Sequence, residues 1–169
     1  MKINKDSLTA KIKNLSLKTN TDFNDILKNY FFDCLLKRLC KSDYSKNLIF
    51  KGGFLLSHIF GLDKRTTDDM DFSYANRETN DKREISLSTC TTDASIYCIF
   101  DSIIKIDAED DVTFEINDIS PIRKSDIYGG FRVKITGHLD NIKEHFYIDV
   151  ATGDIITPFP IPFIYNCLF

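Results

Sequence analysis

The residues with the clearest chemical potential in this sequence are two aspartates separated by one position, Asp69 and Asp71. Along an extended strand, residues two apart project from the same face. We therefore expect these two carboxylates to point together, while Met70 and Phe72 point into the core. Aligned carboxylates are suited to a divalent cation, because Mg²⁺ and Mn²⁺ prefer oxygen ligands.

Two glycines, Gly52 and Gly53, precede the aspartates and open an apolar segment that we expect to form a helix. Free backbone N–H groups and the positive end of the dipole make a helix N-terminus attractive to anions, and glycine allows a phosphate to approach closely. The buried side of this helix would come from its five apolar residues, Phe54, Leu55, Leu56, Ile59 and Phe60. A phosphate cradle beside paired carboxylates predicts a metal-assisted site for a nucleoside triphosphate.

A third carboxylate, Asp149, lies in a segment where apolar and polar residues alternate, which predicts a strand with one buried face. We expect the segment 128–139 to be its hairpin partner, with Arg132, Lys134 and Thr136 on the shared polar face. Three carboxylates gathered within ~5 Å repel one another by about 3 kcal/mol per pair at an effective dielectric near 20. Their convergence would therefore require a cation.

Other polar residues near these motifs are weaker candidates. Lys51, Arg65 and Lys134 could neutralise triphosphate charge, and each could equally be a surface or loop-anchoring cation. We expect Thr67 to order the loop before the strand rather than to contact substrate. Asp68 should face the opposite way on the strand, so we exclude it from the site.

The order of these motifs resembles the DNA polymerase β nucleotidyltransferase superfamily, in which Gly-Gly, a helix and Asp-x-Asp on a strand follow one another. The finer pattern is Lys51-Gly52-Gly53 before the helix and Arg65-x-Thr67-x-Asp69-x-Asp71 after it. It is similar to the AbiEii/AbiGii-type toxin nucleotidyltransferases, abortive-infection proteins of bacterial type IV toxin–antitoxin systems. A third match runs over 149–154 and continues through 155–158, so the resemblance spans nearly the whole chain.

This resemblance implies an α+β, polymerase β-like fold, with a mixed sheet of about five strands and helices packed on one face. It implies transfer of a nucleoside monophosphate from an NTP to an acceptor such as tRNA, and a cognate antitoxin as partner. Asp69 and Asp71 would be direct ligands of Mg²⁺ or Mn²⁺. Asp149 would complete a second metal site and activate the attacking hydroxyl, with Gly52 and Gly53 holding the β and γ phosphates. Lys134 would be the basic residue of the strand between the carboxylate motifs.

Composition predicts a single cytoplasmic domain. The chain has 169 residues, 43% of them apolar, which is enough for one substantial core. A net charge of −3 argues against a protein held to nucleic acid by overall charge alone. We find no secretory signal, and the apolar segment 155–169 is too short and too rich in proline to span a bilayer. Five cysteines without a Cys-x-x-Cys pair predict reduced, mostly buried thiols.

Periodicity divides residues 1–169 into a helical N-terminal part (1–45), a catalytic α/β core (46–158) and an apolar tail (159–169). We expect helices over 7–17, from about residue 20 to 41, from residue 52, and from residue 92. Strands are expected over 48–50, 69–74, 112–119 and 128–139, with another carrying the third carboxylate. The acidic run 107–111 lacks the glycine and the spacing of a calcium loop and predicts a solvated turn.

Two other interpretations stay open. A glycosyltransferase could use Asp-x-Asp to hold manganese and a nucleotide sugar, but it needs a nucleotide-binding α/β half before the motif, where this sequence indicates helices. A non-catalytic remnant is also consistent with the resemblance, because full-length relatives continue into a helical half with a Lys-Asp motif that this sequence lacks. Its apolar tail would pack on its own sheet, on a second copy in a homodimer, or on a separate helical partner.

Overall fold

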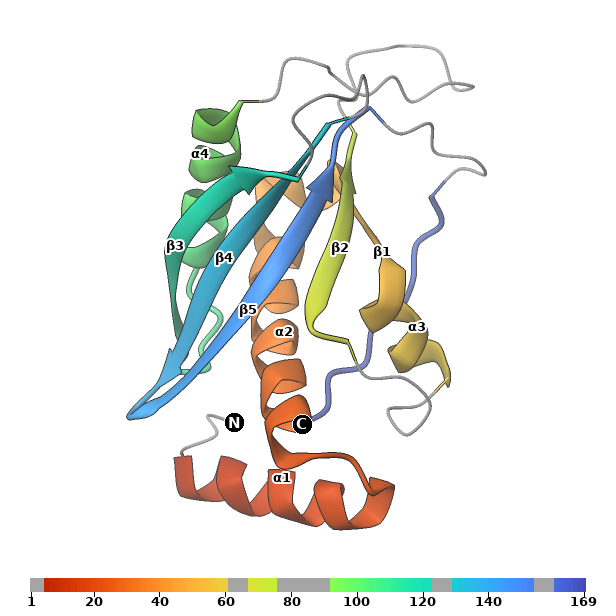
Figure 1. Ribbon diagram of the computed structural model, residues 1–169. Coiled ribbons are helices and arrows are strands. Elements are labelled where there is room, and N and C mark those ends of the chain that lie inside the picture. Colours follow the sequence, from red (N-terminus) through yellow and green to blue (C-terminus); the bar gives the residue numbers. More distant parts are fainter. Residues whose placement is uncertain (1–4, 61–66, 76–91, 123–128, 154–159) are drawn as a thin grey trace.

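The computed structural model describes residues 5–60, 67–75, 92–122, 129–153 and 160–169. It shows an α+β fold in which helices cover one face of a five-stranded mixed sheet (Figure 1), as the sequence predicts. The helices are α1 (Lys5–Thr19), α2 (Phe23–Lys41), the 3-10 helix η1 (Asp43–Lys46), α3 (Gly52–Phe60) and α4 (Asp93–Ile104). The strands are β1 (Leu48–Lys51), β2 (Asp69–Tyr74), β3 (Thr113–Pro121), β4 (Gly130–Leu139) and β5 (Ile142–Ala151).

The strand order is β1-β2-β5-β4-β3. β2 and β5 run parallel, and the other neighbouring pairs are antiparallel. The parallel pair places Asp71 opposite Asp149, and the β4–β5 hairpin places Arg132 opposite Asp149 from the other side. Three strands therefore bring their polar residues to one region of the sheet.

The inner face of the sheet is apolar and packs on α2. Phe131, Val133 and Ile135 from β4 and Phe146, Ile148 and Val150 from β5 are buried, as alternation predicts, and so are Met70 and Phe72 from β2. Phe32 of α2 makes edge contacts with Phe54 and Phe146, at ring-centroid distances of 4.7 and 5.0 Å. Because this face is filled by α2, the polar residues of the same strands are left on the outer face.

Helix ends differ from prediction by a few residues. α1 begins at Lys5 and ends at Thr19, two residues beyond each end of the predicted range 7–17. α2 begins at Phe23, because the Asp22 side chain accepts a hydrogen bond from the backbone N–H of Asn24 and caps the helix. None of the helices in the described part of the chain is long and apolar enough to cross a membrane.

The C-terminal segment 160–169 packs against the protein's own helices. It runs beside α3 and ends near α1 and the first half of α2 (Figure 1). Tyr165 stacks on His58 with ring centroids 4.0 Å apart and donates a hydrogen bond to Asp33 of α2. The backbone N–H of Leu168 donates to the same carboxylate at 2.6 Å. Tyr165 also contacts Phe50 of β1, with ring centroids 6.4 Å apart. Of the three tail contacts expected from sequence, packing within the chain is therefore present, on the helices and on an edge strand of the sheet.

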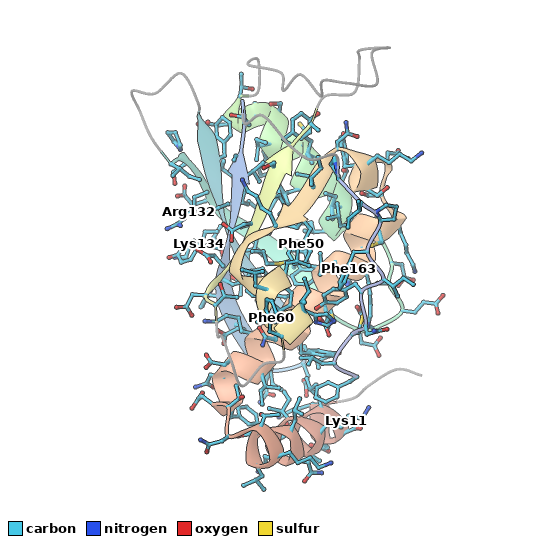
Figure 2. All side chains as sticks on the ribbon, turned by 90° about the vertical axis from the view of Figure 1, so that its right-hand side faces the viewer. Lys11, Phe50, Phe60, Arg132, Lys134 and Phe163 are labelled. Carbon is cyan, nitrogen blue, oxygen red and sulfur yellow. The ribbon has the colours of Figure 1, made fainter. Side chains whose placement is uncertain are left out.

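The prediction for the buried side of α3 is wrong in part. Phe54 is buried, but Leu56, Ile59 and Phe60 are 39, 51 and 60% exposed. Residues of the C-terminal segment are also exposed, and Phe60 and Phe163 face the same side of the molecule (Figure 2). Only one side of this short helix meets the core, through Phe54, whose ring contacts Phe50 of β1 and Phe32 of α2.

Two further predictions need correction. Asp110 does not lie in a solvated turn; it is buried and receives two hydrogen bonds from Arg38 of α2, at 2.8 and 2.7 Å. This pair joins α2 to the segment before β3. The four cysteines in the described residues are free as expected, but only Cys34 is buried, and Cys40 and Cys98 are exposed.

Candidate active site

Three carboxylates meet on the outer face of the sheet. Asp69 and Asp71 come from β2, and Asp149 comes from β5. One carboxylate oxygen of each lies within 4.8 Å of the oxygens of the other two. The structure thus brings together the three aspartates that strand alternation placed on one face.

A glycine at the start of α3 allows Asp71 to reach its position. Gly52 has φ of +79°, which side chains rarely adopt, and a Cβ there would lie 1.9 Å from Oδ2 of Asp71. The next residue, Gly53, donates its backbone N–H to the Asp71 carboxylate. The first turn of α3 therefore binds a carboxylate of the protein itself, and the missing side chain at Gly52 makes room for it.

A basic residue that sequence analysis did not select completes the cluster. Arg132 of β4 donates to Asp149 through Nε and Nη2, at 2.7 and 2.6 Å, and its Nη2 lies 3.8 Å from Oδ2 of Asp69. Its guanidinium also lies over the ring of Tyr147, 5.2 Å from the centroid. The hydrogen bonds to Asp149 raise the pKa of Arg132 above its ordinary value. A fixed cation thus neutralises part of the acidic cluster.

The turn between β4 and β5 carries the signal that could have identified this arginine. Leu139 pairs with Ile142 across a two-residue turn, in which Asp140 has φ of +53°. Counting back along both strands from such a turn places Arg132 opposite Asp149 and Lys134 opposite Tyr147. Lys134 lies on the same outer face as Arg132, away from α2 (Figure 2).

Burial and the neighbouring charges both act on the pKa of Asp71. Burial, followed by the negative charges of Asp69 and Asp149, raises the pKa of Asp71 above its ordinary range. The Gly53 N–H and the charge of Lys51, which pairs with Asp71 across β1 and β2, oppose this rise. A bound cation would favour the ionised form further.

The remaining candidates have clear positions. Thr67 donates its hydroxyl to Oδ1 of Asp69 at 3.1 Å and so orders the entry to β2, as predicted. Asp68 is exposed and pairs with Lys28 of α2, away from the other carboxylates. Arg65, and the third motif from Asp154 onward, lie outside the described residues.

The donor set fits a hard divalent cation. All the converging side-chain atoms are carboxylate oxygens, which are the ligands that Mg²⁺ and Mn²⁺ prefer over sulfur or nitrogen. The cluster is open to solvent, since all three aspartates are half-buried. Because Arg132 already binds Asp149, a metal ion would have to displace the arginine or share the carboxylate with it.

One comparison with known proteins gives a match. A family model described as nucleotidyl transferase AbiEii toxin, type IV TA system, matches residues 34–168, which is most of the chain. Neither the search of curated proteins nor the search of solved structures gives a match. The matched range includes all the elements that carry the three aspartates, the two glycines and Arg132.

Proposed function

Because the chain belongs to the AbiEii family of nucleotidyltransferase toxins from type IV toxin–antitoxin systems, we propose that it is a metal-dependent enzyme. It would transfer a nucleoside monophosphate from a nucleoside triphosphate to an acceptor hydroxyl. The observation that carries this proposal is the approach of three carboxylates from β2 and β5 to within 4.8 Å of one another. The Asp-x-Asp glycosyltransferase alternative has no support from the family match.

Divalent metal ions, when bound, would neutralise charge on the triphosphate and lower the pKa of the attacking hydroxyl. Asp69 and Asp71 would hold such an ion from one strand, with Thr67 orienting Asp69 and the Gly53 N–H orienting Asp71. Asp149 would provide the third ligand from the neighbouring parallel strand. Mg²⁺ and Mn²⁺ both suit these oxygens.

Cationic side chains around the cluster would bind the triphosphate. Arg132 has a planar guanidinium that suits a phosphate, and its contact with Asp149 places it beside the proposed metal site. Lys134 lies on the same face, and Lys51 lies across from Asp71. We assign Arg132 the role of the basic residue between the carboxylate motifs, with Lys134 and Arg65 as further candidates.

The acceptor and the protein partner follow only from the family. We propose tRNA as acceptor, a cognate antitoxin as the regulator, and the cytoplasm as the location. The exposed apolar residues of α3 and of segment 160–169 would suit a homodimer or a separate helical partner.

The test is label transfer from each radiolabelled nucleoside triphosphate to total tRNA, with Mg²⁺ or Mn²⁺. We expect transfer by the wild-type protein and its loss, by at least ~100-fold, in Asp69→Asn and Asp71→Asn, because each removes a metal ligand. Asp68→Asn is the matched control, since Asp68 is adjacent in sequence but pairs with Lys28. Transfer that persists in both site variants would contradict the assignment.

A second candidate function is binding of a nucleotide without transfer, as in a remnant of the family. The contact between Arg132 and Asp149 supports this second function, because an arginine that remains bound to Asp149 would prevent Asp149 from binding a metal ion. Isothermal titration with a triphosphate and Mg²⁺ separates the cases. Binding without label transfer to any acceptor would identify a binding module, and transfer would identify the enzyme.

A further inference from the structure

The free edge of β3 forms a second candidate binding surface, distinct from the three carboxylates. β3 pairs with β4 on one side, and no strand in the described residues pairs with its other side. An edge strand directs the backbone N–H and C=O of every second residue outward, where another extended chain can pair with them. β3 is nine residues long, whereas β1, at the opposite edge, has four. The β3 edge is therefore the longer of the two, and a register shift divides it into two parts.

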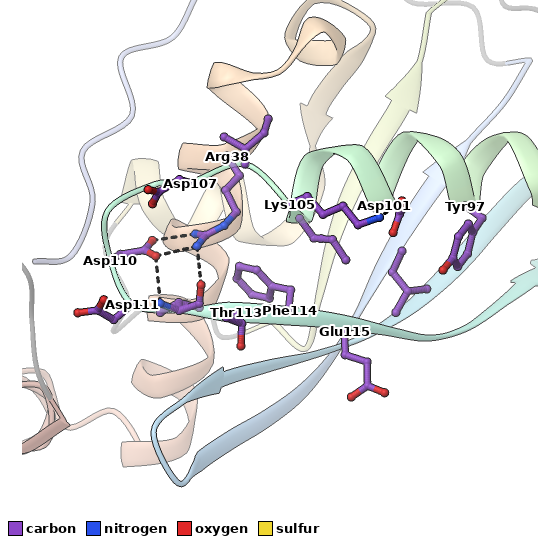
Figure 3. A pocket seen from close by; sticks show the side chains of 14 residues that line it. Arg38, Tyr97, Asp101, Lys105, Asp107, Asp110, Asp111, Thr113, Phe114 and Glu115 are labelled. Carbon is purple, nitrogen blue, oxygen red and sulfur yellow. Dashed lines mark hydrogen bonds and ion pairs between the residues drawn. The ribbon is translucent and has the colours of Figure 1, made fainter.

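A groove follows this edge, between β3 and α4 (Figure 3). A cavity of about 880 Å³ lies between the second half of α4 and the start of β3, and one of about 340 Å³ lies farther along both elements. Tyr97 and Ile116 line both cavities, so the two lie next to each other along β3 and α4. We call the two together the β3–α4 groove.

The groove has the surfaces that an added strand requires. Ile104, Phe114, Ile116 and Ile119 are half-buried and line it with apolar side chains, and Tyr97 projects from α4, 48% exposed. Side chains of an extended peptide alternate between two faces, so every second one would contact this apolar lining. A strand edge beside a helix is the arrangement in which peptides bind by strand addition.

The charges of the groove define the partner's chemistry. Five acidic residues line the larger cavity and two more line the smaller one, against two basic residues, Arg38 and Lys105. One of the acidic side chains, that of Glu115, points away from α4 (Figure 3). Both basic residues have acidic partners within the groove: Arg38 binds Asp110, and Lys105 binds Asp101 at 2.6 Å. The groove is therefore acidic overall. It repels nucleic acid, and it also repels a second copy of the same edge.

A register shift in β3 limits the pairing segment. The ladder to β4 is regular over Thr113–Ile116 and shifts between Ile116 and Asp118. Such a bulge interrupts an edge, so regular pairing with another chain is available beside the larger cavity. We propose that the β3–α4 groove binds an extended, lysine- or arginine-rich segment of a partner protein, which adds as a strand to β3 at Thr113–Ile116. This proposal does not depend on the proposed nucleotidyl transfer.

The probe is a fluorescein-labelled peptide of about nine residues, a common strand length, that alternates lysine with valine and has blocked ends. We expect fluorescence anisotropy to show binding that weakens as salt is added, because the attraction is partly electrostatic. A peptide with glutamate in place of lysine should not bind. A peptide with proline in place of valine keeps its charge but cannot complete the backbone ladder, and it should bind at least about ten-fold more weakly. Equal binding of the proline peptide would overturn strand addition.

Protein variants test the location. The charge reversals Glu115→Lys and Asp118→Lys, at exposed positions of β3, should together weaken peptide binding by about ten-fold or more. Asp6→Lys, at an exposed position of α1, reverses a distant charge and should leave binding unchanged. Hydrogen exchange of the wild-type protein should show added protection in 113–116 with the peptide bound. No binding, equal loss in the Asp6 variant, or protection elsewhere would each overturn the proposal.

Discussion

The placement of Asp71 by Gly52 leads to a test with three glycine-to-alanine variants. In Gly52→Ala, the new Cβ would lie 1.9 Å from Asp71 Oδ2, so the carboxylate must move. The alanine must also either adopt the unfavourable φ near +79° or shift the backbone. A left-handed conformation costs about 1–2 kcal/mol for a residue with a side chain. Loss of the charge-assisted hydrogen bond from Gly53, at a half-buried position, costs about 1–2 kcal/mol more. We expect a total of about 2–4 kcal/mol.

Two other glycines separate loss of stability from loss of the site. At Gly137 a Cβ would lie 2.4 Å from Cδ1 of Phe31, in the core, and overpacking there costs about 1–3 kcal/mol. At Gly129 it would lie 3.5 Å from Oγ1 of Thr152, which is an ordinary contact. Gly137→Ala should therefore lose stability without changing the carboxylates. Gly129→Ala should stay within about 0.5 kcal/mol of wild type.

The measurements are thermal unfolding by circular dichroism and Mn²⁺ binding by electron paramagnetic resonance, the latter at a temperature where all the variants are folded. Gly52→Ala should unfold about 5–15 °C lower than wild type and bind Mn²⁺ at least about ten-fold more weakly. Gly137→Ala should show a comparable loss of stability with unchanged Mn²⁺ affinity. The reasoning is refuted if Gly52→Ala is as stable as Gly129→Ala, or if it loses stability but keeps its affinity for Mn²⁺.

Three further predictions concern residues outside β2. Arg132→Gln removes the cation that competes for Asp149, so Mn²⁺ should bind about ten-fold more tightly in an electron paramagnetic resonance titration; unchanged affinity would exclude competition. Tyr165→Phe removes the hydroxyl that donates to Asp33, and urea unfolding should show a loss of about 1–3 kcal/mol in the free energy of unfolding. An unchanged free energy of unfolding would show that this contact of the C-terminal segment does not stabilise the fold. Burial raises the pKa of Asp33 from 3.8 to about 6 in the folded protein. The folded state therefore favours the protonated carboxyl, and its contribution to the free energy of unfolding is complete below about pH 4 and is lost as the pH rises through about 6. Relative to Asp33→Asn, the wild-type protein should therefore lose about 3 kcal/mol of unfolding free energy across this pH window. If the unfolding free energies of the two proteins change with pH in parallel, the raised pKa of Asp33 is contradicted.

The sequence was sufficient to predict features that depend on a single strand, such as its bounds and the face on which each side chain lies. The alternation around Asp69 and Asp71 predicted the bounds of β2 and the burial of Met70 and Phe72 correctly. The same pattern placed Asp149 on the outer face of β5. These predictions succeeded because the side-chain period of a strand is fixed by backbone geometry and does not depend on the neighbours.

Predictions that required a distant partner were less successful. The contact of Arg132 with Asp149 was not predicted, because it follows from the hairpin register that the two-residue turn at Asp140 determines; the role of Lys134 stays a prediction. The buried state of Asp110 depends on Arg38, which lies 72 positions earlier in the chain. α3 is apolar on several sides, so its sequence could not indicate that Phe60 is exposed. In each case the missing information was the identity of the tertiary neighbour.

The position of β5 has a consequence for synthesis. Of the strands in the described residues it comes last in the chain, yet it lies at the centre of the sheet, between β2 and β4. While a ribosome is still translating codons before Asp149, the β1–β2 pair and the β3–β4 pair have no connecting strand. A nascent chain thus cannot gather its acidic cluster early. A harmful activity that used this cluster would begin only after the central strand has emerged and inserted.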